Sequence, residues 1–458
     1  GARRADDRFT ARVTNTVWHM AQGGIYDHLG GGFARYSVDA EWLVPHFEKM
    51  AYDNAGLIRL MTRLYQKTKQ PLLKRRIEET IGWVSAELRH DRGGFWSSYD
   101  ADSEGVEGKY YVWTDEEIDA ALGPNAARFK TAYDVSPSGN WEGRTILNRS
   151  HVAQDDEAEE EVLAPLRATL TSIRKGRVPP GLDDKILTDW NGLMIAAYAE
   201  AALVFDRPDW LAAAAETYRF VQQELTGDGG RLSHAWREGK ARHAGILDDY
   251  ANMADAALQL FEASGNRTYI ADAEAFAEQV DTHFADGQEG GYFLTADDAE
   301  ALIVRTKSAL DSPTPSGNGT MVGVLARLTA LTGKTIYRDR AQAIVTAFSG
   351  KMDQHFWGLS TLLANLGYLH RPDQVVIIGD REDPATHALS RTAVERYLPT
   401  RILCLIEPDS ALPEGHPAFG KNRVDDQPTA YYCPGQTCRA PVTDPADLAA
   451  LLDGEGKP

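Results

Sequence analysis

A helical repeat of nearly fixed length runs through the first 370 residues and limits the folds open to this chain. Its first copy reads YDNAGLIRLMTRLYQKTKQ, then the amphipathic LLKRRIEETIGWVSAELRH, then DRGGFWSSYD. Later copies begin at TDWNGLMIAAYAEAALVF, LDDYANMADAALQLFEAS and PSGNGTMVGVLARLTALTG, and the spacing from Asn54 to Gly93 is 39 residues against 38 from Asn191 to Gly229. Each full copy is therefore predicted to be two helices, a Gly-Gly turn and a short strand; the last copy keeps only a reduced turn, WG.

The two helices of each copy differ in polarity. The first is the more apolar, as in NGLMIAAYAEAALVF, which is hydrophobic nearly all round, and the second has one apolar face. This contrast predicts a buried inner helix and a half-exposed outer one. With helical segments at 7–22, 159–176 and 358–369, we predict a mainly α protein, an (α/α)6 toroid with short β-hairpins at its rim. An open solenoid is the alternative, although its units are normally shorter and more uniform. Inner helices are expected to begin near Asp53, Asp189, Asp249 and Gly317, and outer helices near Leu72, Asp209, Tyr269 and Tyr337.

The pattern changes after Arg371. QVVIIGD and RILCLIEP have the composition of buried strands, and THALSRTAVERYL between them has that of a helix. We therefore expect a toroid over residues 1–370 and a small α/β element over 371–458. VVIIGD carries a single glycine, so the GxGxxG pattern of a dinucleotide site is missing and no cofactor is predicted.

Charge and hydropathy exclude several classes of partner. The net charge of −19 gives no basic stripe for nucleic acid and no attraction to anionic membrane surfaces. The sequence contains no run of about 18 apolar residues, which is the length needed to span a bilayer. The first residues, GARRADDRFT, lack an initiator Met and the apolar core of a signal peptide, and we expect a processed or cloned boundary there.

Three cysteines are too few for a disulfide framework. Cys404 lies in an apolar run and is expected in the core. Cys433 and Cys438 are five residues apart in YYCPGQTC, where we expect a turn near the surface that closes on itself. They could form a redox pair or have no special role, and because no second pair completes a zinc set, no metal is predicted. A cytoplasmic location is expected.

Unusual polar and aromatic residues gather at the predicted starts of inner helices and in the loops that lead to them. Helix N-termini there offer free N–H groups to hydroxyls and carboxylates of a ligand. Capping alone could explain Asp53, Asp189, Asp249 and Ser316. Capping does not explain the neighbouring tryptophan, tyrosine, histidine and lysine, and aromatic rings mixed with carboxylates are typical of sugar sites. We therefore expect one pocket at the mouth of the toroid.

Two kinds of acid–base chemistry fit this set. Paired carboxylates support glycoside hydrolysis, and the acids considered for it are Asp53, Asp100, Asp102, Asp248 and Asp249. Histidines with a near-neutral pKa can move a proton on and off a sugar carbon. Those considered are His28 and His46, with His234 and His243 less favoured. The candidate catalytic residues are His28, His46, Asp53, Asp102 and Asp249. The candidate substrate-binding residues are Glu48, Asp100, Lys185, Trp190, Tyr250, Lys307 and Asn318.

Five long motifs carry a resemblance to a known family. They are GGIYDHLGGGFARYSVDAEWLVPHFEKMAYDNA, YDADSEGVEGKYYVWT, DDKILTDWNGLMIAA, EALIVRTKSALDSPTPSGN and TAYYCPGQTCRAP. Over essentially the whole chain, the sequence resembles the thioredoxin-domain-containing family that includes spermatogenesis-associated protein 20. The resemblance implies a helical region similar to six-hairpin glycosidases and N-acylglucosamine 2-epimerases. It also implies a partner, an N-terminal thioredoxin-like domain that would end just before this chain begins.

These observations predict a carbohydrate-active enzyme of sugar isomerase/epimerase or glycoside hydrolase type, with a small sugar-like ligand in the central cavity. The alternative is a non-catalytic, redox-linked binding or chaperone-like module that works with the thioredoxin-like domain. Acids or histidines that face each other at catalytic distances would favour the enzyme.

Overall fold

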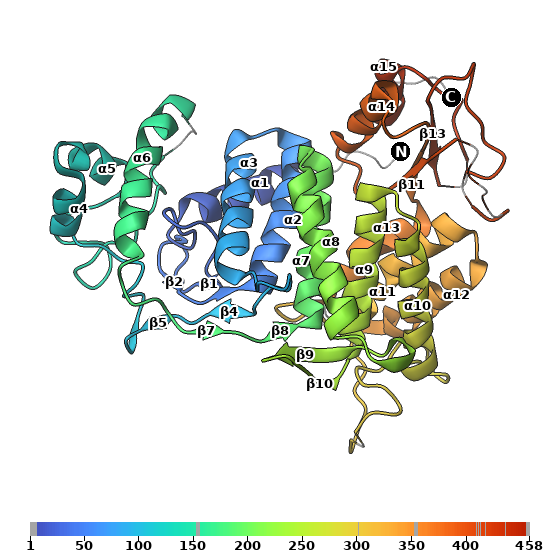
Figure 1. Cartoon of the computed structure of the whole chain (residues 1–458), viewed down its shortest axis with the longest axis horizontal. Coiled ribbons are helices and arrows are strands. Elements are labelled where there is room, and N and C mark those ends of the chain that lie inside the picture. The colour runs from blue at the N-terminus through green and yellow to red at the C-terminus, as the bar shows by residue number, and fades with distance from the viewer. Residues whose placement is uncertain are drawn as a thin grey trace. The chain divides into compact units, whose positions relative to one another are not determined.

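The computed structural model describes residues 7–152, 156–300, 302–351, 356–408, 410, 412, 414–416, 418–435 and 437–454. The chain divides into two compact units (Figure 1). Unit 1 comprises Gly1–His90 and Phe95–Lys185, and unit 2 comprises Asp91–Gly94 and Ile186–Pro458.

Unit 1 contains the first predicted hairpin. Its helices α2 (Ala51–Thr68) and α3 (Pro71–Trp83) begin within two residues of the expected positions, α1 (Asp7–Gln22) covers the predicted first segment, and a π-helical turn, η1 (Val84–Leu88), extends α3. Short antiparallel strands surround this hairpin. They are β1 (Tyr36–Ser37) with β2 (Pro45–His46), β3 (Lys49–Met50) with β4 (Ser98–Tyr99) and β7 (Leu182–Asp183), and β5 (Asp102–Ser103) with β6 (Val106–Glu107).

Unit 1 also holds two helices that the sequence pattern did not predict. They are α4 (Asp115–Leu122) and α5 (Ala126–Tyr133), linked by the 3-10 turn η2 (Gly123–Asn125). Both pack with α6 (Glu157–Arg174) around a small apolar core of their own. A capping box between Thr114 and Glu117 starts α4 and was the available sequence signal.

Unit 2 contains the remaining hairpins, and their predicted starts are confirmed to within two residues. The inner helices are α7 (Thr188–Phe205), α9 (Leu247–Ser264) and α11 (Gly317–Thr332), followed by α13 (Ser360–His370). The outer helices are α8 (Pro208–Glu224), α10 (Thr268–His283) and α12 (Thr335–Phe348). The inner helices pack in chain order, α7 on α9, α9 on α11 and α11 on α13. Burial of almost every side chain of α7 explains its uniform hydrophobicity.

Short elements complete the hairpins of unit 2. Strands β8 (Ile186–Leu187), β9 (Ser233–Arg237) and β10 (Lys240–Ala244) form one antiparallel sheet with β9 in the middle. The 3-10 turns are η3 (Asp228–Gly230), η4 (Ser349–Lys351) and η5 (Phe356–Leu359). η3 contains the predicted Gly-Gly turn, and β9 places the residues that follow it next to the start of α7.

The C-terminal part of unit 2 is the expected α/β element. Strand β11 (Asp373–Ile378), helix α14 (Pro384–Val394) and strand β12 (Arg401–Ile406) form a parallel βαβ unit. Strand β13 (Thr429–Pro434) adds to the other side of β11 in antiparallel orientation, and α15 (Pro445–Asp453) packs against α14. The last two elements were not predicted.

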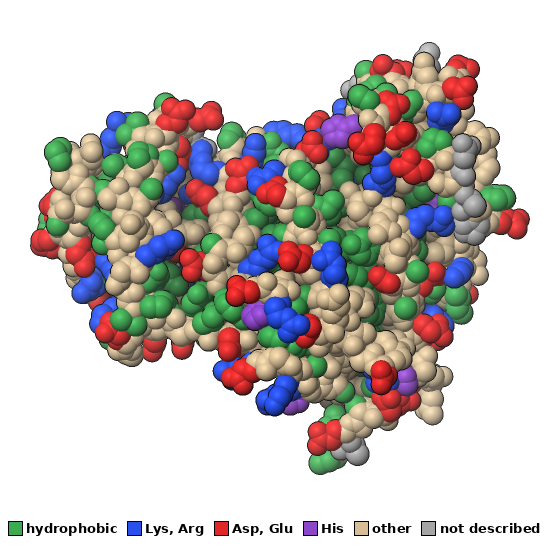
Figure 2. All heavy atoms as spheres, in the orientation of Figure 1, with side chains coloured by type: hydrophobic (Ala, Val, Ile, Leu, Met, Phe, Trp, Pro, Cys, Tyr) green, Lys and Arg blue, Asp and Glu red, His purple; other side chains and the backbone are tan. Residues whose placement is uncertain are grey.

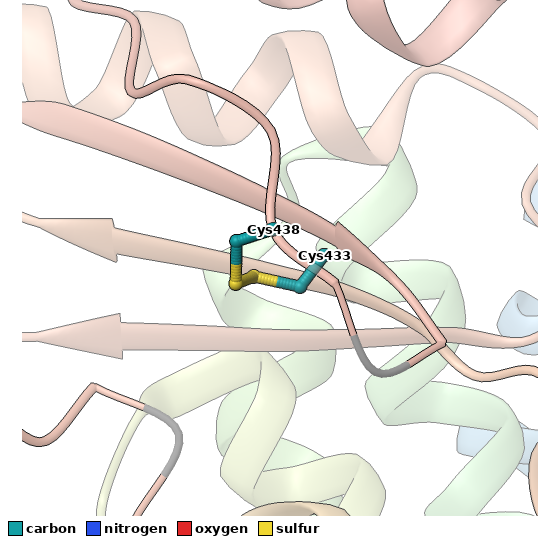
Figure 3. Close-up of a disulfide and its surroundings, with 2 residues drawn as sticks. All are labelled: Cys433 and Cys438. Carbon is teal, nitrogen blue, oxygen red and sulfur yellow. A yellow bond between two sulfur atoms is a disulfide. The ribbon is translucent and has the colours of Figure 1, made fainter. Parts of the chain in front are cut away.

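The three cysteines lie in this element. Cys433 and Cys438 form a disulfide whose Cα atoms are 3.9 Å apart, which confirms the expected closed turn (Figure 3). Cys404 is buried in β12, as predicted, and burial raises the pKa of its thiol to about 12. A thiol with such a pKa is unreactive at neutral pH.

The predicted fold class is confirmed: the protein is mainly α, built of helical hairpins with short strands and a C-terminal α/β element. A ring that includes the hairpins of both units stays a prediction, as does the division at residue 370. Within the described ranges, no helix is long and apolar enough to cross a membrane. Acidic and basic side chains are interspersed on the face shown in Figure 2.

Candidate functional site

Two of the predicted residues of unit 1 meet in a small polar cluster. His46, at the end of β2, contacts Glu107 through Nδ1 at 2.8 Å and Glu48 through Nε2 at 3.2 Å. Glu48 also accepts a hydrogen bond from Arg35 at 3.1 Å, and Tyr36 stacks on the imidazole ring. The extended backbone places His46 and Glu48 on one side, as their i, i+2 spacing requires.

Asp53 lies in the first turn of α2 and has unusual electrostatics. Its Oδ2 atom is buried without a hydrogen-bond partner among the described residues. Burial raises the pKa of Asp53 to about 7, against the opposing charge of Arg35. A carboxyl group of this kind can exchange a proton near neutral pH.

Three other predicted residues of unit 1 lie on or next to its short strands and make local contacts or are exposed. Asp100 accepts hydrogen bonds from the N–H groups of the next two residues, which is a turn-stabilising role. Asp102 is exposed on β5. Lys185 is half-exposed and pairs with Asp183 at 3.1 Å.

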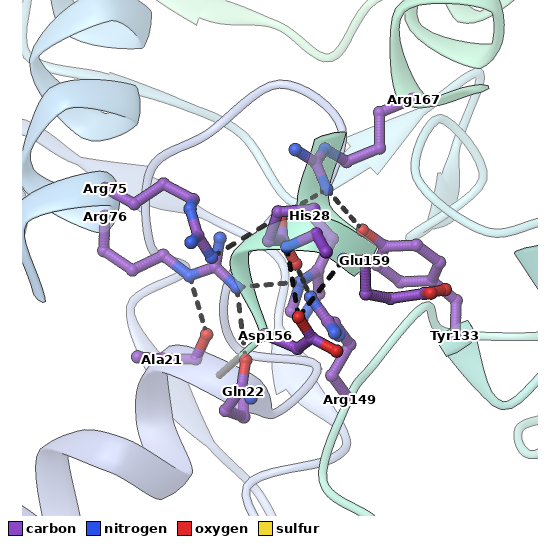
Figure 4. Close-up of polar contacts among 12 residues, drawn as sticks. Ala21, Gln22, His28, Arg75, Arg76, Tyr133, Arg149, Asp156, Glu159 and Arg167 are labelled. Atoms are coloured by element: carbon purple, nitrogen blue, oxygen red, sulfur yellow. Dashed lines mark hydrogen bonds and ion pairs between the residues drawn. The ribbon is translucent and has the colours of Figure 1, made fainter. Parts of the chain in front are cut away.

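His28 is buried rather than exposed at a rim. Its Nε2 lies 3.0 Å from the carbonyl oxygen of Gly23, and its Nδ1 lies 3.5 Å from Arg76 (Figure 4). Burial, reinforced by the charge of Arg76, lowers the pKa of His28 well below its usual value. The neutral imidazole therefore serves as a hydrogen-bonding group, and the structure does not support the proposed role of His28 in proton transfer at neutral pH.

Arginine side chains are concentrated around His28. Glu160 of α6 contacts Arg75, Arg149 and Arg167 together. Arg167 also donates to the hydroxyl of Tyr133 at 2.9 Å (Figure 4). This concentration of cations inside unit 1 contrasts with the net charge of −19 for the chain.

In unit 2, hydrogen bonds link the starts of three inner helices. Asp249 of α9 accepts the N–H of Asp189 of α7 at 2.9 Å, and Asp248 accepts the N–H of Gly317 of α11 at 2.7 Å. Asp249 also caps its own helix through the N–H of Ile246 at 2.8 Å. These carboxylates therefore satisfy helix N-termini, the capping role considered from the sequence.

A histidine completes this arrangement. Nδ1 of His234, on β9, lies 3.1 Å from both carboxylate oxygens of Asp249. The Asp249 side chain is fully buried, whereas the imidazole of His234 is 29% exposed. Asp249 thus holds one nitrogen of the imidazole, and Nε2 is left for a further contact. We call Asp189, His234 and Asp249 the acid–histidine cluster.

Proton affinities in the acid–histidine cluster are shifted upward. The hydrogen bond with Asp249 raises the pKa of His234 to about 9. Burial, reinforced by the charge of Asp249, raises the pKa of Asp189 to about 8. At neutral pH the cluster therefore holds an imidazolium–carboxylate pair beside a protonated Asp189, so that two buried negative charges are avoided.

The acid–histidine cluster could also hold a divalent cation, because one ligand atom from each residue lies within 4.8 Å of the others. Hydrogen bonds already occupy both oxygens of Asp249 and Nδ1 of His234. A metal ion would have to replace several of these bonds.

The remaining predicted residues of unit 2 take different positions. Trp190 is half-buried next to Asp189. Tyr250 is fully buried, and its hydroxyl accepts the N–H of Leu232 at 2.9 Å, so this residue belongs to the core and not to a ligand surface. Lys307 and Asn318 stabilise the turn that follows α10, through hydrogen bonds of 2.6 and 2.9 Å to Asp286 and Tyr292.

Asp189 was expected only as a helix cap, and His234 was a less favoured histidine than His28 and His46, so neither was among the selected site residues. Asp189 has the position of a helix cap, and His234 follows a Gly-Gly turn without any motif around it. Their relation to Asp249 depends on the packing of β9 and of the α7 and α9 starts. No local sequence pattern encodes such a contact.

Comparison with known proteins places this mainly α, hairpin-built chain among a small set of relatives. No family model matches it. It is 32% identical to spermatogenesis-associated protein 20 of Homo sapiens and 31% identical to that of Mus musculus, in each case over 96% of this chain and 62% of the relative. The resemblance carried by the motifs is thereby confirmed, and the chain spans about three fifths of the length of these relatives.

Solved structures with a partly similar arrangement are carbohydrate enzymes. Cellobiose 2-epimerase from Bacillus thermoamylovorans B4167 aligns with a TM-score of 0.48 and 10% identity over 75% of this chain and 73% of that chain. The glycoside hydrolase family 76 mannosidase Bt3792 from Bacteroides thetaiotaomicron VPI-5482 aligns with a TM-score of 0.48 and 10% identity over 79% and 81%.

Proposed function

We propose that this protein is a sugar isomerase or epimerase in which His234 transfers a proton to and from a sugar carbon. The observation that carries the proposal is the contact of His234 Nδ1 with both oxygens of the fully buried Asp249. A carboxylate in that position fixes the orientation of the imidazole and leaves Nε2 for the substrate. Asp249 is then a positioning residue.

The geometry favours this chemistry over glycoside hydrolysis. Asp249 is fully buried and its oxygens accept hydrogen bonds from two backbone N–H groups, so it cannot approach a sugar carbon as a nucleophile. Hydrolysis also needs two carboxyl groups that face the substrate. A single histidine that takes the proton from the sugar carbon in its neutral form and returns it is sufficient for isomerisation.

The surroundings of His234 suit a hydroxylated ligand. Asp189 is protonated at neutral pH and can donate a hydrogen bond, and the half-buried indole of Trp190 follows it in α7. Sugar rings commonly combine hydrogen bonds to acids with contact on an aromatic face.

The test is proton exchange at the sugar carbon next to the carbonyl. The protein is incubated in D2O with a panel of reducing mono- and disaccharides, and loss of the C2 proton signal is followed by ¹H NMR. We expect exchange with at least one sugar, at a rate that rises between pH 7 and pH 9 as His234 loses its proton.

Two variants sharpen the test. His234→Gln removes the proton-transfer group and should abolish exchange. His283→Gln is the matched control, because His283 contacts Asp297 at 2.9 Å in an exposed pair, and it should leave exchange unchanged. Equal activity of wild type and His234→Gln would refute the proposal. Release of nitrophenol from nitrophenyl glycosides without any C2 exchange would replace it by hydrolysis.

The cysteine pair supports a second candidate function, a redox-linked module that works with a thioredoxin-like domain. Cys438 is exposed and disulfide-bonded to Cys433, so an external thiol can reach it. In the predicted cytoplasmic location such a disulfide is expected to be transient and redox-active. Reduction of the pair by thioredoxin, followed with a thiol reagent, tests this candidate; a pair that stays oxidised would exclude it.

A further inference from the structure

The same turn is built once in each unit, and the two copies allow a direct comparison. In unit 1, Lys49 donates to Oδ2 of Asp27 at 2.7 Å and to the carbonyl oxygen four residues further on at 2.8 Å. In unit 2, Lys307 donates to Oδ2 of Asp286 at 2.6 Å and to the carbonyl oxygen four residues further on at 2.9 Å. One lysine and one aspartate are therefore enough to hold this turn.

Unit 1 adds a second cation that the turn does not need. Arg174 of α6 binds both oxygens of Asp27, at 2.7 and 2.9 Å. Its approach depends on Gly30, where an added Cβ would overlap Nη2 of the guanidinium. The equivalent position in unit 2 is Glu289, whose carboxylate lies 3.5 Å from Nζ of Lys307.

The result is an excess of positive charge around one buried carboxylate. The side chains of Lys49, Arg174 and Asp27 are 3%, 6% and 8% exposed. Two cations therefore share one carboxylate away from water, which is unfavourable unless another anion completes the set. The buried Nε of Arg174 has no hydrogen-bond partner among the described residues.

These groups form the wall of a cavity of about 300 Å³ that lies within unit 1. Its charged lining consists of Lys49, Arg167, Arg174 and Lys175 opposite Asp27, Glu79 and Glu87. Glu79 is already paired with Arg76, behind the wall, at 2.8 Å. The cavity has the size of a small-molecule site, and its charge favours an anion.

Aromatic rings form another part of the wall. The guanidinium of Arg174 lies 5.1 Å from the ring centre of Tyr110 and 5.5 Å from that of Tyr111. The ammonium of Lys49 lies 4.8 Å from the ring centre of Trp83. Cations held against aromatic faces keep their positions, and the rings themselves offer surfaces for a flat or ring-shaped ligand.

We propose that this cavity binds a small molecule that carries a phosphate or carboxylate group on a ring or sugar, with Arg174 and Lys49 contacting the anionic oxygens. The site uses no residue of the acid–histidine cluster. Anion binding in this cavity and the proposed isomerase activity can therefore be tested independently. The turn in unit 2 is held by Lys307 without a second cation. Arg174, the second cation of the cavity, is therefore not needed to hold the backbone in unit 1.

The first experiment measures binding to the wild-type protein. Glucose 6-phosphate, gluconate, inorganic phosphate and glucose are each titrated by calorimetry, and the melting temperature is recorded at 10 mM ligand. We expect the charged ligands to bind and to raise the melting temperature by about 2 °C or more, with affinity that falls as salt is added, and glucose to have no effect. Binding by glucose 6-phosphate alone or by gluconate alone separates the phosphate source from the carboxylate source.

The variants test whether binding occurs at this cavity. Lys49→Met removes one cation but leaves Arg174 on Asp27, and it should weaken binding about tenfold or more. Gly30→Ala displaces Arg174 without removing a charge and should weaken binding as well. Lys307→Met removes the same turn contacts in unit 2 and should leave the affinity unchanged.

Two outcomes would overturn the proposal. The first is wild-type protein that binds none of the three anions. The second is equal weakening by Lys49→Met and Lys307→Met, since this would mean that the turn and not the cavity matters. Retained secondary structure in circular dichroism confirms that each variant is folded.

Discussion

The raised pKa of the buried carboxyl group of Asp189 predicts how the free energy of unfolding changes with pH. Burial and the charge of Asp249 raise the pKa of Asp189 to about 8 in the folded protein, against about 3.9 in an unfolded chain. A raised folded pKa means that the folded state keeps a proton that the unfolded state has lost between these two values. The contribution to stability is therefore greatest below pH 4 and decreases as the pH rises to 8.

The substitution Asp189→Asn removes this proton but keeps the shape of the side chain. One extra proton in the folded state changes the free energy of unfolding by about 1.4 kcal/mol per pH unit. From pH 5 to pH 7, wild type should therefore lose about 2.7 kcal/mol of stability relative to Asp189→Asn. His234 also destabilises the folded protein as the pH rises from about 6.5 to about 9. Between pH 5 and pH 7 Asp189 is protonated and uncharged, so this effect is the same in both proteins and cancels from their difference.

The assay is urea unfolding of wild type, Asp189→Asn and the control Asp228→Asn at pH 5, 6, 7 and 8 and constant ionic strength. Asp228 is an exposed residue of unit 2, so its substitution makes the same chemical change in water. We expect the control to follow wild type at every pH. Parallel curves for wild type and Asp189→Asn would refute the inference that Asp189 is protonated in the folded protein.

Two further predictions concern stability. Asn318 is buried and forms hydrogen bonds with both the N–H and the carbonyl oxygen of Tyr292, at 2.9 and 2.8 Å. Because both backbone groups lose their partner, Asn318→Ala should lower the free energy of unfolding, measured in urea, by about 2–4 kcal/mol. A loss below about 0.5 kcal/mol would contradict this role. The disulfide between Cys433 and Cys438 closes a loop with a sequence separation of 5. If it acts by restricting the unfolded chain, replacing both cysteines by serine should lower the free energy of unfolding by about 2 kcal/mol. An unchanged free energy of unfolding in calorimetry would exclude that effect.

Features with a local signature were predicted correctly. The starts of α2, α7, α9 and α11 follow from the change to helical periodicity and from the polar residues just before it. The parallel strands β11 and β12 follow from short apolar runs on either side of a helix. The helices α4 and α5 were missed because glycine and proline separate two segments of only eight residues each, too short for a clear periodic signal.

The candidate site was predicted only as a region. The contact of His46 with Glu48 follows from their spacing in an extended segment. His28, Tyr250, Lys307 and Asn318 were selected for the same reason, their position near helix starts. The structure instead gives them roles in packing and in turn geometry, because a position in the sequence does not say whether a side chain is directed toward solvent or toward the protein.

The sequence by itself determined where the helices of the hairpins begin, which helix of each hairpin in unit 2 is the more buried, and that an α/β element follows them. These features depend on residues a few positions apart. Only the tertiary structure decided that His234 lies against Asp249, that Asp249 binds the N–H of Asp189 sixty residues away, and that Arg174 joins Lys49 on Asp27 across 147 residues. Such contacts form between elements whose apolar faces pack together, and packing brings polar side chains into place without leaving a local pattern in the sequence. The pKa of each buried carboxyl group depends on those neighbours and on its removal from water, so it too is a property of the folded chain.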